Sequence, residues 1–115
     1  MTPLGIKTMT LSQLRSTRKS MLSAQWMLSL QDADPASRTS AAQQLLAVNH
    51  ALMTLENAQL ADIRDALVAN EDAITAGAQD LTAALADLGK VKAVISAVSG
   101  FLGIVGKLVS IFEVP

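Results

Sequence analysis

The chain has 115 residues, half of them hydrophobic but only 3% aromatic, with six glycines and no tyrosine or cysteine. Strands favour aromatic and β-branched residues, so this composition favours an all-α fold of one domain over a β-sandwich or barrel. The lack of cysteine excludes a disulfide framework and a thiolate metal site, and the net charge of −1 gives no overall attraction to nucleic acid.

The N-terminal third predicts a loose tail followed by a basic amphipathic helix. Residues 1–8 contain a proline and a glycine and show no periodicity. Residues 9–31 carry apolar residues on one side of the expected helix, and Arg15, Arg18 and Lys19 form a basic cluster in its middle. No apolar segment precedes this cluster, so we expect no signal peptide. Synthesis in the cytoplasm would then be followed by membrane association or by export through a dedicated route.

A second helix is predicted to begin at Pro35. Asp34 is a favourable N-cap residue, and proline suits the first turn of a helix, where its missing N–H is not needed. Seven acidic residues and one arginine lie between Glu56 and Asp87. Residues 36–89 therefore predict an acidic, coiled-coil-like helix.

An apolar stripe, spaced alternately by three and four residues, runs from Leu60 to Phe112. Thirteen of its sixteen positions are Val, Ile, Leu or Phe, which is typical of a helix that packs along one face against a partner. The other three positions are Asn70, Gly77 and Ala84, of which the first two would loosen the middle of the contact. The predicted oligomer stripe comprises Leu60, Ile63, Leu67, Ile74, Leu81, Leu88, Val91, Ile95, Val98, Leu102, Val105, Val109 and Phe112.

Two places in this stripe could interrupt the helix. Asn70 resembles an N-cap that acidic residues follow, and Gly89 resembles a C-cap glycine. The stripe nevertheless keeps its phase across both, which favours one continuous helix over residues 36–112. A hinged helix, a helical hairpin and a bundle remain alternatives, with Gly89 the better hinge.

The pattern of residues 90–115 predicts a hydrophobic C-terminal helix with a narrow face of small residues. This predicted close-packing groove comprises Ser96, Ser99, Gly100, Gly103, Gly106 and Ser110. Small residues spaced by four let helix backbones approach closely in lipid. Lys92 and Lys107 border the groove and would lie near lipid headgroups or a water-filled lumen. The uncharged run between them is shorter than the roughly 20 residues that span a bilayer.

These patterns predict a protein without catalytic residues, cofactor or metal. His50 is the only histidine and has no second ligand at a suitable spacing, and no glycine-rich phosphate loop occurs. We expect a homo-oligomer that inserts its C-terminal segment into a membrane or lies on it, as a pore, a coat or a membrane-perturbing assembly. The alternative is a soluble helical interaction module, such as an adaptor, chaperone or filament subunit, with the apolar C-terminal helix as its oligomer interface. A protein partner on the stripe is possible, and a nucleic-acid partner is not expected.

Overall fold

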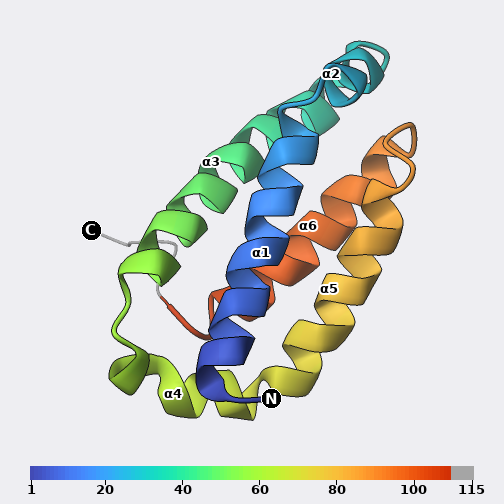
Figure 1. Cartoon of the computed structure of the whole chain (residues 1–115). Coiled ribbons are helices and arrows are strands. Elements are labelled where there is room, and N and C mark those ends of the chain that lie inside the picture. Colours follow the sequence, from blue (N-terminus) through green and yellow to red (C-terminus); the bar gives the residue numbers. More distant parts are fainter. Residues whose placement is uncertain (110–115) are drawn as a thin grey trace.

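The computed structural model describes residues 1–109, and within them the chain forms six α-helices and no strand (Figure 1). The all-α prediction is therefore confirmed. The helices are α1 (Pro3–Met21), α2 (Ala24–Gln31), α3 (Pro35–Asn57), α4 (Leu60–Ala69), α5 (Glu71–Leu85) and α6 (Val91–Val105).

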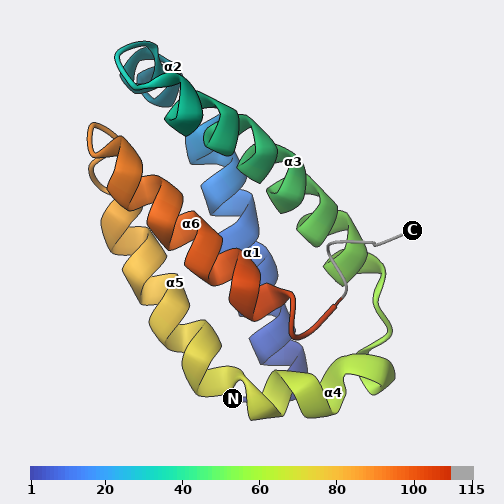
Figure 2. The same cartoon turned by 180° about the vertical axis from the view of Figure 1, so that it is seen from behind.

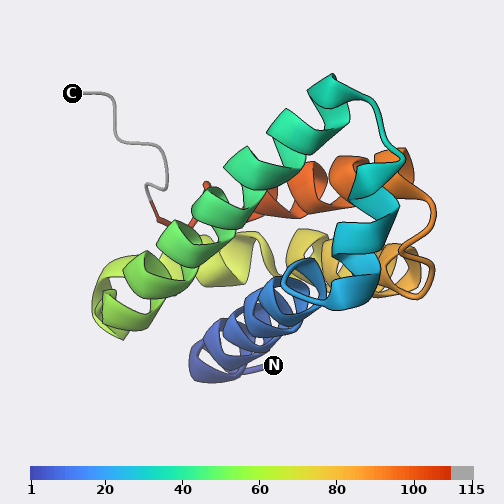
Figure 3. The same cartoon turned by 90° about the horizontal axis from the view of Figure 1, so that it is seen from above.

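The helices pack as a bundle around one core. Helices α1 and α6 lie on opposite faces, and each packs against both α3 and α5 (Figures 1 and 2). Helix α2 lies at one end of the bundle and α4 at the other, and the view from above again shows α1 and α6 on opposite sides (Figure 3). Trp26 and Phe101 are the largest fully buried side chains of this core.

The N-terminal segment differs from the prediction in two ways. Residues 3–8 are helical instead of forming a loose tail, because the Thr2 hydroxyl accepts a hydrogen bond from the Gly5 N–H at 3.0 Å and caps α1. The predicted single helix over residues 9–31 is divided between α1 and α2. Ser23 caps α2 by accepting a hydrogen bond from the Trp26 N–H at 3.2 Å, and the turn lets the Trp26 side chain enter the core.

The prediction of a continuous helix over residues 36–112 is wrong. The chain leaves the helical conformation at Ala58 and Gln59, both of which are extended, again at Asn70, and over residues 86–90. Side chains stabilise two of these helix ends: the Lys7 ammonium donates to the Ala58 carbonyl at 2.9 Å, and the Asn70 amide donates to the Ala66 carbonyl at 2.8 Å. The first bond satisfies a carbonyl at the C-terminal end of α3, and the second adds to the bond that the Asn70 N–H already donates to the Ala66 carbonyl at 3.1 Å.

The apolar stripe keeps its phase across these breaks because every helix turns it toward the same core. Ile63 and Leu67 of α4, Ile74 and Leu81 of α5, and Val98 of α6 are all buried. A shared core imposes one register on separate helices, as a single long helix would. Phase continuity alone therefore could not distinguish the two folds.

Helices α5 and α6 approach each other closely at Gly77. A Cβ atom at this position would lie 2.8 Å from Ile104 Cδ1 and 3.2 Å from Phe101 Cδ1. Glycine leaves room there for two large side chains of α6. The stripe position expected to loosen the contact is thus a point of close packing.

Candidate functional site

The predicted oligomer stripe lies within the chain's own core. All of its members in residues 1–109 are buried or half-buried, against helices of the same chain. Phe112 lies outside the described residues. The intramolecular core accounts for the heptad pattern without requiring a second copy at these side chains.

The small residues of α6 have a different environment. Ser96, Ser99, Gly100, Gly103 and Gly106 are all exposed, and we call them the outer face of α6. A Cβ atom at Gly100 or Gly103 would meet no atom of the described chain within 4 Å. Ser110, the last predicted member of the close-packing groove, lies outside the described residues. The predicted groove is therefore open along the part of α6 that the structure describes.

Two shallow grooves flank this face. The groove between α3 and α6 has a volume of about 360 Å³, and that between α5 and α6 about 280 Å³. Ala47 and Leu102 are among the residues that line the first groove, and Asp80 and Gly100 are among those that line the second. Helix α6 lies between α3 and α5 (Figure 2), and its small residues are exposed between these two neighbours.

Gln44 of α3 lines the groove between α3 and α6 and lacks one hydrogen bond. Its side chain is only 7% exposed, and its amide N–H groups donate to the Ile95 carbonyl at 2.7 Å and to the Ser99 hydroxyl at 3.3 Å. Its Oε1 atom is buried and has no hydrogen-bond partner within residues 1–109. A buried acceptor without a partner typically costs about 1–3 kcal/mol. A donor bound in this groove would recover that cost.

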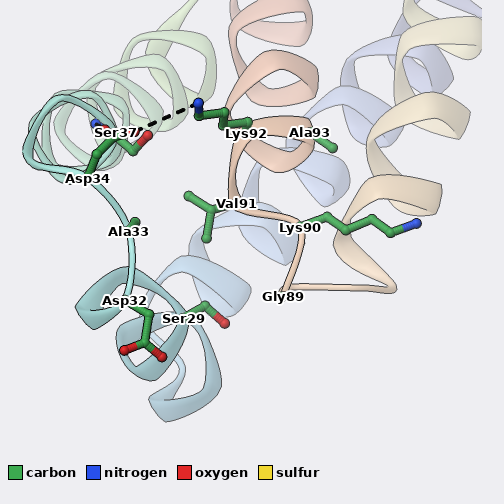
Figure 4. A pocket seen from close by; sticks show the side chains of 10 residues that line it. All are labelled: Ser29, Asp32, Ala33, Asp34, Ser37, Gly89, Lys90, Val91, Lys92 and Ala93. Atoms are coloured by element: carbon green, nitrogen blue, oxygen red, sulfur yellow. Dashed lines mark hydrogen bonds and ion pairs between the residues drawn. The ribbon is translucent and has the colours of Figure 1, made fainter.

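The first residues of α3 and α6 meet at one end of the bundle, and Lys92 lies there (Figure 4). Its ammonium is 3.8 Å from the Asp34 carboxylate, in an exposed ion pair. The N–H and hydroxyl of Ser37 hold the pKa of Asp34 below its ordinary value of 3.8, and the positive charges of Lys92 and Arg38 lower it further. This corner joins the two helices through the ion pair of Asp34 and Lys92. Lys107, the other predicted headgroup lysine, is exposed just beyond α6.

Two findings on residues 1–109 concern metal-ligating side chains and the length of apolar helices. These residues contain no cluster of three or more His, Cys, Asp or Glu side chains that could hold a metal ion. His50 is exposed on α3. None of the described helices has the length and apolar character needed to cross a bilayer.

Comparisons of the chain with protein-family models, with curated proteins and with solved structures give no match. The assignment of function therefore rests on the chain's own geometry.

Two residues of this region, Gln44 and Asp80, were not predicted from the sequence. Gln44 has a detectable signal, because Ala41, Val48 and Leu55 of the same helix are buried at the spacing that includes position 44. A polar residue within a buried series marks a buried polar group. Asp80 carries no such signal, since exposed acidic residues occur throughout its region of the sequence.

Proposed function

We propose that the chain is a non-enzymatic helical interaction module that self-associates through the outer face of α6. The observation that carries this proposal is the open space over Gly100 and Gly103. A glycine inside a helix destabilises it by about 0.5–1 kcal/mol relative to alanine. A second helix on this face would offset that cost through close backbone packing.

The chemistry of the face fits a second copy of the chain. Its members are serine and glycine, so two copies would bring no like charges together at the centre of the contact. Val94, Val98 and Phe101 belong to the apolar side of α6, and this side is buried in the bundle. Association through the outer face therefore requires no unfolding of the core.

The test is the mass of the 12.0 kDa chain in solution as a function of its concentration, measured by light scattering and sedimentation equilibrium. We expect reversible association of the unchanged chain. The substitution Gly103→Leu should weaken it about tenfold or more, because the added side chain separates the two backbones. The folded chain should tolerate leucine here, since the position is open and leucine is the better helix former.

The matched control is Ala61→Leu, which adds a leucine at an exposed position of α4 at the end of the bundle. It should leave the association constant unchanged. A monomeric chain at all accessible concentrations would overturn the proposal. Equal association by Gly103→Leu and the unchanged chain would also overturn it.

A second candidate function is contact with a membrane surface by α5 and α6. The observation that favours it is the absence of charged residues between Lys92 and Lys107. Exposed ion pairs contribute about 0–1 kcal/mol. The contact of α6 with α3, which includes the exposed pair of Lys92 and Asp34, therefore depends mainly on buried apolar side chains and on the Gln44 hydrogen bonds. Helix α6 has 15 residues and would extend about 22 Å, less than the ~30 Å hydrocarbon core of a bilayer. The segment would therefore lie in the interface, with both lysines near headgroups.

Co-flotation with vesicles of zwitterionic and anionic lipid tests this second candidate. The intact chain should float with the vesicles at physiological salt and release an encapsulated dye. The paired substitutions Lys92→Glu and Lys107→Glu should reduce flotation, because anionic headgroups repel the new carboxylates. An intact chain that stays in the soluble fraction and releases no dye would exclude membrane contact.

A further inference from the structure

We infer that the second copy docks with its α6 antiparallel, around a two-fold axis at Gly103, so that Lys107 of each copy meets Asp80 of the other. This inference rests on the self-association proposed above and specifies its partner and geometry. It depends on three features: the lysines that border the outer face, Asp80 beside it, and the unpaired oxygen of Gln44.

The two lysines restrict how two α6 helices can pair. In a parallel pair, the Lys107 residues of the two copies would lie at the same level along the helices. In an antiparallel pair centred midway between the lysines, Lys92 of each copy would lie beside Lys107 of the other. Like charges repel in both arrangements. An antiparallel pair centred at Gly103 avoids both contacts and places the open backbone of that glycine at the crossing point.

The position of Asp80 matches this centre. Asp80 lines the groove beside Ala97 and Gly100, which precede Gly103 along α6. Lys107 follows Gly103 by four residues. At 1.5 Å per residue, Asp80 and Lys107 therefore lie at similar distances, roughly 6 Å, on either side of the proposed axis. The two-fold rotation exchanges these levels and places each lysine beside the aspartate of the other copy.

The lateral arrangement agrees with this pairing. Gly100 lines the groove toward α5. Helix α6 ends at Val105, but the Gly106 N–H donates to the Leu102 carbonyl at 2.9 Å and the Lys107 N–H to the Ile104 carbonyl at 3.0 Å, so a helical turn continues the path of α6. Lys107 follows Gly100 by seven residues, about two turns, and therefore lies on roughly the same side. A two-fold axis across α6, in the plane of the interface, brings the α5 sides of the two copies together. The Asp80 carboxylate and the partner's ammonium thus meet on one side of the contact, twice in the dimer.

The opposite side of α6 supplies an independent reason for a bound partner. Gln44 lines the groove toward α3 and is more than nine-tenths buried, and its Oε1 atom has no partner among the described residues. A donor of the docked copy that entered this groove would satisfy the oxygen. The second copy would therefore place opposite charge on one side of the contact, and on the other side it would cover the groove that holds the unpaired oxygen of Gln44.

Charge exchange tests the proposed pairing. Each of the substitutions Asp80→Lys and Lys107→Asp should weaken self-association about fivefold or more, because each creates two like-charge contacts in the dimer. The double variant carrying both substitutions should associate as the unchanged chain does. The difference between single and double variants should shrink at high salt, which screens exposed charges. Single variants that associate normally, or a double variant that shows no recovery, would overturn the pairing.

A cysteine experiment tests the axis, and the absence of cysteine from the natural chain makes it simple. Gly103→Cys should form a disulfide-linked dimer under mild oxidation, because the axis places this residue beside its own copy. Ser96→Cys, also exposed, should not, because its two copies would be about 21 Å apart along the helices, whereas a disulfide needs Cα atoms within about 7 Å. Equal cross-linking of both variants would indicate parallel helices and overturn the inference.

The outcomes separate this inference from the proposed function. A chain that remains monomeric overturns both. A chain whose association is weakened by Gly103→Leu, but which shows neither recovery by charge exchange nor selective cross-linking at Gly103, overturns the antiparallel arrangement alone.

Discussion

Gly77 of α5 and Gly103 of α6 are both glycines within helices, but one is covered and the other is open. At Gly77 a Cβ atom would lie 2.8 Å from Ile104 Cδ1, whereas at Gly103 it would meet nothing of the described chain within 4 Å. A helical glycine costs stability, and at Gly77 the close packing of α5 against α6 offsets that cost. Residues 1–109 provide no such compensation at Gly103. Gly77 thus allows close packing within the fold, whereas Gly103 leaves room for close packing by a partner.

The largest predicted effect concerns the covered region. The substitution Phe101→Ala should lower the free energy of unfolding by about 3–5 kcal/mol, because it leaves a cavity where the ring now packs near Gly77. Urea denaturation followed by circular dichroism measures this change. The control Val68→Ala removes an exposed apolar side chain and should change stability by less than about 0.5 kcal/mol. Similar losses from both substitutions would contradict the assignment of Phe101 to the core.

Leucine substitutions at the two glycines compare the regions directly. Gly77→Leu should lower the free energy of unfolding by about 1–3 kcal/mol through overpacking, whereas Gly103→Leu should leave it unchanged or raise it by up to about 1 kcal/mol. Combining Gly77→Leu with Phe101→Ala should cost less than the sum of the two single losses, since the leucine can occupy part of the cavity. Equal losses from leucine at both glycines would show that Gly103 is also covered.

The sequence predicted the helical class and the apolar stripe well, because periodicity depends on local chemistry. It could not predict the chain reversals, since separate helices that share one core keep the phase of a continuous helix. Asn70 and Gly89 were recognised as possible breaks, and the structure has a helix boundary at Asn70 and a turn that includes Gly89. The break at Ala58 and Gln59 has no proline or glycine to indicate it.

The candidate site was predictable in part for the same reason. The serines and glycines of α6 were identified by their spacing, but their exposure depends on which face of α6 the core covers. Gln44 and Asp80 belong to other helices and reach this region only through tertiary packing. Sequence patterns along one helix could not bring them together.

A smaller effect is expected at Gln44, with opposite signs for folding and association. The substitution Gln44→Met removes the unpaired oxygen together with the amide N–H groups. The two groups that accepted from this amide keep other partners, because the Ile95 carbonyl lies within a helix and the Ser99 hydroxyl is exposed to water. The free energy of unfolding should therefore stay the same or rise by about 1 kcal/mol. Association should weaken, because the donor from the second copy loses its acceptor. A loss of folding stability together with unchanged association would show a purely structural role.

The smallest effect concerns the exposed pair that joins the start of α3 to α6. Asp34→Asn keeps a side chain that can accept the Ser37 N–H, but it removes the charge that faces Lys92. The pKa of Asp34 is lowered in the folded chain, so its ionised form contributes stability above its ordinary value of 3.8, and this contribution is lost as the pH falls below that value. The variant should melt slightly below the unchanged chain at neutral pH, and the difference in Tm should vanish in acid.

The control is Lys92→Ala, which leaves the cap intact. It should reproduce only part of the neutral-pH difference in Tm, because Ser37 lowers the pKa of Asp34 more than Lys92 does. A Tm difference that persisted in acid would mean that the asparagine changes the cap itself, and the charge would then have no part in holding α6 at this corner.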